Sequence, residues 1–534
     1  MSWEREVRDI EEKRKLALEQ GGPAVGDRQH NAGRMTIRER IDTPIDKDSF
    51  HESGAGAGAT ERNPDGSIAS FSPANFVLGF GDINGRRSVV GGEDFTLRGG
   101  SPNEAGLRKS MYAEELACQY RVPLIRLHEG GGGSVTGAGG KTVGTPPYSP
   151  PRFQSVARAM ATVPVATAAL GPVAGLPASR LVASHFSVMS RKTAQVLIAG
   201  PAVVERALHE KKTKEELGGA KVHTRNGVVD NIAKDEEDAF AQIRRFLSYM
   251  PQSVHELPER LASDDDPNRT DEELLSLIPR DRRQIFDARK LIGRVFDTGS
   301  FFEMARDFGR GQIIGLARMN GQAVGVLAND GRFYAGAMTA AGAQKVRRFV
   351  EMCQTFHLPV IALVDEPGFM IGSESEKLGA IRYGTATVMT VASCVVPWAS
   401  VVVRKSYGVA QGAHYGPDAY VLAWPSAEMG ALPIEGGVAV AFRRELAEAE
   451  DPEARRLELE EQLAERTRPN ARAESFSMHE LIDPRETRAR LCQWVEWIQP
   501  ILPSLVGPVS FPVRPKRWRM PLSGIRRNWR RSRR

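Results

Sequence analysis

A repeat within the chain constrains its fold more than any other feature of the sequence. Landmarks of the first half recur 236 positions later: Asn84–Gly85 as Asn320–Gly321, Gly100 as Gly336, Pro123 as Pro359, and Glu129 opposite Asp365. Chance matches among common glycine and proline dipeptides would not be expected to share one spacing. The sequence therefore predicts two copies of one fold.

The other landmarks give similar spacings and set the predicted domain boundaries. Val163–Ala166 falls opposite Val396–Ala399 at a spacing of 233, and Asp48–Phe50 resembles Gly299–Phe301 at a spacing of 251. Loops of unequal length account for the differences. We expect an N-terminal domain over 1–256, a C-terminal domain over 257–510 and a tail over 511–534, each domain large enough for its own core. The stretch 257–279 contains the exposed linker that Ser263–Asn268 predicts.

Apolar periodicity in the first copy predicts alternating strands and helices, which indicates an α/β fold. The predicted strands are Phe76–Ile83, Arg87–Val90 and Leu124–Leu127. The predicted helices are Ser2–Gln20, Met35–Arg40 and Glu104–Tyr120. Gly21–Gly33 is expected to be a break, and the Gly/Ala/Ser-rich stretch Gly54–Ser72 a loop.

Composition excludes several classes of protein. The 534 residues are 41% hydrophobic and 26% charged, as in globular proteins and unlike disordered chains. The longest apolar run, Val391–Val403, is shorter than the roughly 20 residues of a membrane span and contains Pro397. The N-terminus carries no secretory pattern, and the four cysteines form no C-x-x-C pair. We therefore expect a cytoplasmic protein without membrane attachment.

The positive net charge comes from the tail. Arg514–Arg534 holds ten Lys/Arg and no acidic residue, so the net charge of +6 becomes −4 without it. Such a segment can bind an acidic protein surface, anionic lipid or nucleic acid, or it can remain a solvated tail. We favour the solvated tail and expect no nucleic-acid partner.

Each copy carries two glycine-bearing turns after apolar strands: Gly130–Gly133 and Gly171–Gly175, then Pro367–Phe369 and Gly408–Ala410. Glycine lets the backbone approach a ligand, and a strand-to-helix turn exposes N–H donors. Two such donors aimed at one point form an oxyanion hole. The simpler alternative, that these are only tight turns, is weakened because both halves carry a pair.

Side chains typical of acid–base, nucleophilic or metal sites form no recognisable motif, and we expect no metal. His128, beside Glu129, either reaches a site or, more commonly for such a residue, serves packing and hydrogen bonding; His223 is expected to be structural. A site rich in backbone donors suits enolate chemistry in which substrate or cofactor moves the proton.

Several motifs in order along both halves carry a family resemblance. They are Gly91–Thr96 with Gly99–Ser101, Glu216–Ala220 with His223, Val364–Phe369 with Gly372, Gly379–Gly384, Arg404–Gly408 and Ala423–Glu428. From about Ser2 to Pro500 the chain resembles the carboxyltransferase (β) subunit of biotin-dependent acyl-CoA carboxylases, the propionyl-CoA and methylcrotonyl-CoA carboxylase family.

The resemblance implies tandem crotonase-like domains, each a β-β-α superhelix of the ClpP/crotonase superfold. It implies that the N-half binds an acyl-CoA and that the C-half receives carboxybiotin, with biotin carried by a separate α subunit that also has biotin carboxylase. In the family, carboxybiotin releases CO2, the biotin enolate removes the acyl α-proton, and the thioester enolate attacks CO2. The family precedent is a homo-hexameric β core in which the N-half of one subunit faces the C-half of the next.

The resemblance also assigns site residues by position. The thioester-side oxyanion hole maps to Gly131 and Gly132, and the biotin-side hole to Val409 and Ala410. Biotin would contact Gly368, Phe369 and Gly408. The residues expected to bind the acyl-CoA substrate are Gly99, Gly100, Gly130, Gly175, Leu176, Gln411 and Gly412.

Departures from the family pattern keep alternatives open. Leu176 and Val409 stand where the family has a second glycine, and Glu129–Ser134 replaces Asp-Ser-Gly-Gly-Ala-Arg. One alternative is a catalytically silent scaffold subunit in a mixed complex. Another is a biotin-dependent acyl-CoA decarboxylase or transcarboxylase subunit. A stand-alone crotonase hydratase fits less well, because it would not need the second copy.

Overall fold

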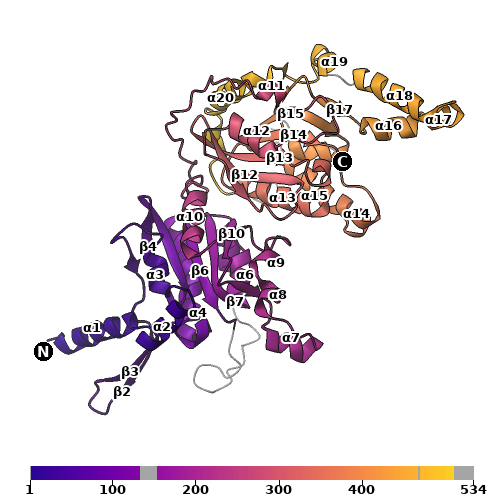
Figure 1. Cartoon of the computed structure of the whole chain (residues 1–534). Coiled ribbons are helices and arrows are strands. Elements are labelled where there is room, and N and C mark those ends of the chain that lie inside the picture. Colours follow the sequence, from indigo (N-terminus) through magenta and orange to yellow (C-terminus); the bar gives the residue numbers. More distant parts are fainter. Residues whose placement is uncertain (1, 133–152, 467–468, 510–534) are drawn as a thin grey trace, which may run out of the picture.

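Two eight-stranded mixed sheets, one in each half of the chain, organise the fold (Figure 1). The computed structural model describes residues 2–132, 153–466 and 469–509, so Gly133 and the basic segment Arg514–Arg534 lie outside the described residues. In the N-half the strand order is β1-β4-β5-β6-β7-β8-β10, with β9 on β7. In the C-half it is β11-β12-β13-β14-β15-β16-β18, with β17 on β15.

The strand bounds show how closely the two sheets correspond. The N-half strands are β1 (His51–Glu52), β4 (Phe76–Ile83), β5 (Arg86–Glu93), β6 (Leu124–Gly130), β7 (Val165–Ala174), β8 (Phe186–Ser190), β9 (Gln195–Leu197) and β10 (Asn231–Ala233). The C-half strands are β11 (Phe302–Met304), β12 (Gln312–Met319), β13 (Gln322–Asn329), β14 (Val360–Glu366), β15 (Trp398–Tyr407), β16 (Tyr420–Ala423), β17 (Glu428–Gly430) and β18 (Glu480–Leu481). In both sheets the first three strands pair antiparallel and the rest pair parallel.

Helices connect and cover the strands. Those of the N-half are α1 (Glu4–Leu18), α2 (Pro23–Asn31), α3 (Ile37–Asp42), α4 (Glu104–Tyr120), α5 (Gln154–Met160), α6 (Leu176–Val182), α7 (Pro201–Leu208), α8 (Lys214–Gly218), α9 (Ala220–His223) and α10 (Glu236–Leu247). Those of the C-half are α11 (Leu274–Leu277), α12 (Ala288–Val295), α13 (Ala340–Thr355), α14 (Ser373–Lys377), α15 (Ala380–Ala392), α16 (Ile434–Ala441), α17 (Arg443–Glu448), α18 (Pro452–Arg466), α19 (Pro469–Glu474) and α20 (Thr487–Ile498). Short 3-10 segments are η1 (Arg98–Gly100), η2 (Tyr334–Gly336), η3 (Val409–His414), η4 (Pro484–Glu486) and η5 (Leu502–Leu505).

The predicted tandem α/β architecture is confirmed element by element. β4, β5, η1, α4 and β6 begin 236 positions before β12, β13, η2, α13 and β14. β7 begins 233 positions before β15, and β1 begins 251 positions before β11. Both sheets are therefore products of one folding pattern with loops of different length.

Buried apolar runs explain why the central strands form. All seven residues of β6 and all seven of β14 are buried, as expected for parallel strands covered on both faces. On the C-half sheet, α13 packs one face through Val346, Phe349 and Val350. α12 and α20 pack the other face through residues such as Leu291 and Leu491.

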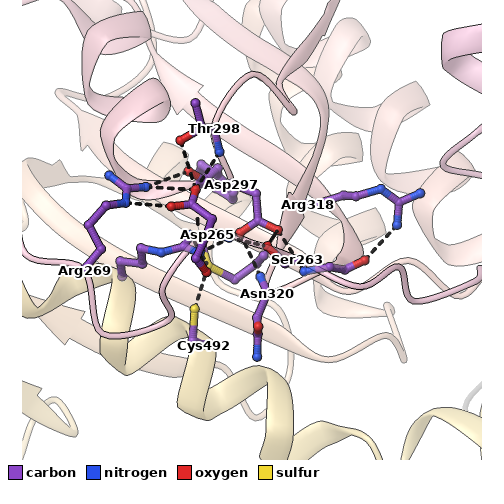
Figure 2. Close-up of polar contacts among 12 residues, drawn as sticks. Ser263, Asp265, Arg269, Asp297, Thr298, Arg318, Asn320 and Cys492 are labelled. Atoms are coloured by element: carbon purple, nitrogen blue, oxygen red, sulfur yellow. Dashed lines mark hydrogen bonds and ion pairs between the residues drawn. The ribbon is translucent and has the colours of Figure 1, made fainter.

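A carboxylate clamp recurs at the hairpin turn of each half. Asp297 accepts hydrogen bonds from the backbone N–H groups of Asn320 (3.0 Å) and Gly321 (2.8 Å), as Figure 2 shows in part. At the spacing of 251, Asp46 accepts from Asn84 and Gly85 at 3.1 and 2.7 Å. The repeat thus preserves this side-chain hydrogen bonding as well as the backbone pattern.

In the C-half this clamp also fixes the linker. Asp265 accepts from Thr298 N–H (2.7 Å) and from Arg269 (2.9 Å), as Figure 2 shows. Arg488 lies 2.9 Å from Asp297. Burial alone would raise the pKa of Asp265, but the hydrogen bonds from Thr298 and Arg269 outweigh it and lower that pKa. The stretch that we predicted as an exposed linker is therefore fastened to the C-half.

The two halves share a hydrophobic core and polar contacts. One continuous cluster of buried side chains includes Phe186 and Phe246 from the N-half and Phe302 and Phe349 from the C-half. Asn231 of β10 donates to the Glu303 carbonyl (3.2 Å), and Figure 1 shows α10 next to the C-half. The halves therefore pack as one body within a chain.

Three local predictions were wrong. Most of the expected turn Gly171–Gly175 is strand, because β7 extends to Ala174 and only Gly175 follows it. Within the expected break, α2 forms because Pro23 is suited to a first helical position and the buried Gln29 bonds to Glu129 at 3.0 Å. Within the expected loop, β2 (Gly58–Arg62) and β3 (Ile68–Pro73) form an antiparallel hairpin. Its turn contains Pro64, Asp65 and Gly66, a strong turn signal that overrides the loop-like composition.

Among the described helices, none combines the length and the apolarity needed to cross a bilayer.

The two clamps are expected to contribute unequally to stability. Asp297→Ala leaves the buried Arg488 guanidinium without its 2.9 Å partner, a loss of about 3 kcal/mol, whereas Asp46→Ala removes hydrogen bonds at an exposed turn, about 1 kcal/mol. At about 2–4 °C per kcal/mol, thermal unfolding should show midpoints lowered by about 6–12 °C and about 2–4 °C. Equal shifts would contradict this assignment.

Candidate active site

Parallel strand pairing brings the two glycine turns of each half together. β6 pairs with β7, and β14 pairs with β15, so the carboxyl ends of each pair lie at the same edge of their sheet. In each half a glycine with positive φ follows the second strand: Gly175 (64°) and Gly408 (63°). The structure thus places Gly130–Gly132 beside Gly175, and Gly368 near Gly408.

The N-half turns touch through their backbones. A Cβ atom added at Gly132 would lie 2.6 Å from the Cα of Gly175, and one at Gly175 would lie 2.6 Å from the Cα of Gly132. A Cβ at Gly100 would lie 2.6 Å from the Gly130 Cα. Only glycine permits these approaches, and they bring η1, the end of β6 and the start of α6 to one point.

The predicted N-half donors differ in how they are used. The N–H of Gly131 donates to the Gly99 carbonyl at 3.1 Å. Leu176 is the first residue of α6, where backbone N–H groups have no partner within the helix. Leu176 and Gly100 both line one small cavity, with Glu93 and Arg180. The next residue, Pro177, has no N–H, so the start of α6 offers one backbone donor fewer than the start of η3 in the C-half.

In the C-half the turn after β15 becomes η3. Val409 and Ala410 are its first residues, so their N–H groups also lie at a helical start. The Val409 side chain is 65% exposed and Ala410 is fully buried. The valine therefore keeps its donor and directs its side chain to the surface.

The remaining predicted C-half residues pack around this turn. The Gly368 carbonyl accepts from Met338 N–H at 3.0 Å. Phe369 lies against α15, because a Cβ at Gly384 would be 2.3 Å from its ring. A Cβ at Gly412 would be 3.1 Å from Val388 of the same helix, and Gln411 Oε1 accepts from the Ser406 hydroxyl at 2.9 Å. Gln411 and Gly412, both in η3, thus pack against β15 and α15.

Equivalent acids beneath the turns are neutralised by arginine. Glu129 accepts from Arg40 at 2.6 Å and lies 3.1 Å from Arg34. Asp365 accepts from Arg404 at 3.0 and 2.8 Å. Burial opposes the charge on Arg40, but Glu236 and Glu129 outweigh it and raise the Arg40 pKa. These acids are structural ion pairs, not free bases.

The histidines considered from the sequence are held inside the protein. His128 is fully buried, with Nδ1 3.1 Å from Glu93. Burial would raise the pKa of Glu93, but His128 outweighs it and lowers that pKa. His223 Nε2 lies 2.7 Å from the Val196 carbonyl, so it serves a structural contact as expected.

Sequence reasoning missed a buried polar group in the C-half. Glu366, at the end of β14, is fully buried beside His414 of η3, with Oε2 and Nε2 3.2 Å apart. The available signal was an acid at the end of an apolar strand just before Pro367 and Gly368. The 48 positions between the two residues hid the pairing.

Comparison with known proteins gives a consistent result. Residues 28–499 match the family described as Carboxyl transferase domain. The carboxyltransferase subunit of propionyl-CoA carboxylase from Haloferax mediterranei is 35% identical, over 92% of this chain and 95% of that protein. The alpha subunit of methylmalonyl-CoA decarboxylase from Veillonella parvula is 30% identical, over 88% and 91%.

A solved structure agrees with both sheets. The transcarboxylase 12S crystal structure, described as a hexamer assembly with methylmalonyl-coenzyme A and methylmalonic acid bound, superposes with a TM-score of 0.83 at 29% identity. The match covers 93% of this chain and 96% of that one. The expected crotonase-like carboxyltransferase fold is confirmed.

The contact between Gly132 and Gly175 makes a testable claim about stability. Gly175→Ala adds a methyl group 2.6 Å from the Gly132 Cα at a residue with φ of 64°, which should cost about 2–4 kcal/mol. Gly56→Ala meets no atom within 4 Å and serves as the control. Thermal unfolding should show a clear loss for Gly175→Ala only; equal midpoints for both variants would refute the close contact.

Proposed function

The chain belongs to the carboxyl transferase domain family, and we propose that it transfers CO2 from carboxybiotin on a partner subunit to an acyl-CoA. The acceptor is the α carbon of the acyl group, or the vinylogous γ carbon of an unsaturated acyl chain. The observation that carries the proposal is the pair of glycine turns at the carboxyl ends of parallel strands in each half.

The N-half is proposed to hold the thioester. Gly131 N–H already donates to Gly99, so we place the developing enolate oxygen at the N–H groups of Gly132 and Leu176. Gly99, Gly100, Gly130 and Gly175 shape this turn through their close backbone contacts. Fixed N–H donors stabilise a developing oxyanion by about 3–4 kcal/mol each, since they need no reorganisation.

The C-half is proposed to hold biotin. Its Val409 and Ala410 N–H groups would bind the ureido oxygen, with Gly368, Phe369 and Gly408 lining the approach. Bound carboxybiotin supplies the CO2 and, after release, the acceptor for the α-proton. The protein's own task is to stabilise negative charge, which fits the full burial of the His128 and His414 side chains.

Assembly with other copies is part of the proposal. Large apolar side chains are exposed around the C-half turn: Ile371, Leu378, Ile381, Met389 and Val409. Such a patch marks an interaction surface, and the transcarboxylase relative is described as a hexamer. We propose a homo-hexameric core bound to biotin-carrying α subunits, in the cytoplasm, where the four buried cysteines remain free thiols.

A related activity is the second candidate. Relatives of similar coverage are described as a methylmalonyl-CoA decarboxylase alpha subunit and a methylmalonyl-CoA carboxyltransferase 12S subunit. We therefore keep the possibility that the same turns serve the reverse reaction, the transfer of CO2 from an acyl-CoA to biotin. The silent-scaffold alternative rests on Leu176 and Val409, yet both positions keep their backbone N–H.

Reconstitution tests the proposal and identifies the acyl group. The chain is combined with biotin-carrying α subunit, bicarbonate and ATP, and ADP release is followed with acetyl-, propionyl-, butyryl-, 3-methylcrotonyl- and long-chain CoA thioesters. One thioester should stimulate release. No stimulation by any of them, with a stable complex on a sizing column, would support the scaffold alternative.

Two substitutions at one position isolate the C-half donor. Val409→Pro removes the N–H at a first helical position, where proline is tolerated, and Val409→Ala keeps it. We expect kcat to fall about 10²–10³-fold for proline and to stay within a few-fold for alanine. Similar activity in both variants would exclude the Val409 N–H from the site.

A further inference from the structure

One buried carboxylate joins the two turns of the C-half. Glu366 Oε1 accepts from the Gly368 N–H at 3.0 Å. Its Oε2 accepts from Asn329 Nδ2 at 3.1 Å and from Gln312 Nε2 at 3.3 Å, and lies 3.2 Å from His414 Nε2. Glu366 therefore connects the turn after β14, the ends of β12 and β13, and η3.

His414 extends this connection to the candidate oxyanion hole. It is the last residue of η3, the six-residue segment that begins with Val409 and Ala410. Its carbonyl accepts from Trp398 Nε1 (2.8 Å) and the Ser400 hydroxyl (2.7 Å). Its imidazole is fully buried, and within the described residues Nδ1 has no hydrogen-bond partner, so Glu366 alone orients the ring.

The N-half shows that the fold does not require this arrangement. At the spacings of the repeat, Gly130 occupies the position of Glu366 and Leu181 that of His414. The N-half forms the same parallel pair and glycine turn with those residues. A buried carboxylate is costly unless fully hydrogen-bonded. The N-half also buries an acid beside its turn, Glu93, but that acid contacts His128 of β6, whereas Glu366 contacts His414 of η3. The link between the carboxylate and η3 therefore points to a task specific to the C-half.

We propose that Glu366 is a positioning residue for the biotin-side turn, acting through Gly368 and His414. The inference rests on the proposed function, because it assigns Val409 and Ala410 to that turn. The carboxylate fixes η3 relative to the turn after β14, and so fixes where the two N–H donors point. A displacement of about 1 Å at such a site costs about 10²-fold in rate.

The test separates positioning from folding. Glu366→Ala removes all four contacts, Glu366→Gln keeps one acceptor oxygen at nearly equal size, and His414→Leu installs the N-half residue. Glu351→Gln, at an exposed i, i+4 ion pair on α13, is the matched control. Each variant is assayed with carboxylated biotin carrier for kcat, with acyl-CoA for Kd by calorimetry, and for its thermal midpoint.

We expect kcat to fall about 10²-fold in Glu366→Ala and about 10-fold in His414→Leu, with partial recovery in Glu366→Gln and no change in Glu351→Gln. The Kd for acyl-CoA should change far less than kcat, because the N-half turn is untouched and only Gln411 and Gly412 of the expected acyl-CoA contacts lie in η3. A folded Glu366→Gln and His414→Leu pair with wild-type kcat would overturn the proposal, even if Glu366→Ala fails to fold. Parallel losses of kcat, acyl-CoA binding and stability in every Glu366 variant would also overturn it, as a purely structural role.

The wild-type measurement distinguishes failure of the proposed function from failure of the positioning role. A wild-type chain without transfer from any carboxylated carrier removes the proposed function and this inference together. An active wild type with active Glu366 and His414 variants removes only the positioning role.

Discussion

Parallel pairing of two central strands in each sheet is the constraint on which the site depends. Because β6 runs parallel to β7 and β14 to β15, the turns that follow them meet at one edge. The meeting requires glycine, as the 2.6 Å approach of Gly132 and Gly175 shows. Fixed backbone N–H groups at such turns can stabilise a developing oxyanion, which is the role that we propose for them.

The two halves share this geometry but support it differently. Both neutralise an equivalent acid with arginine, Glu129 with Arg40 and Asp365 with Arg404. Among the described residues, only the C-half has a carboxylate that contacts both of its turns, Glu366. The two copies of the fold thus contain different buried polar groups, which fits our proposal that the halves bind different ligands.

Much of the fold could be predicted because the repeat spacing and the apolar strands are local signals. The bounds of β4 and α4 match the predicted ranges. The predicted turn Gly171–Gly175 was placed too early, because β7 extends to Ala174 and only Gly175 follows it. The hairpin β2–β3 and helix α2 were missed, since glycine-rich composition concealed a Pro64–Gly66 turn and a tertiary contact of Gln29. Glu366 and His414 were missed because their pairing depends on β14 and η3 meeting in three dimensions. The roles of the individual site residues remain predictions.

The central claim is that this chain moves a carboxyl group between two ligands held by the two halves. The most direct measurement supplies the chain with carrier protein bearing ¹⁴C-carboxybiotin and an acyl-CoA, without ATP or biotin carboxylase. The account predicts that label appears in an acid-stable carboxylate on the thioester, only when chain and acyl-CoA are both present. Label that remains on the carrier, although the carrier binds the chain stably, would contradict it.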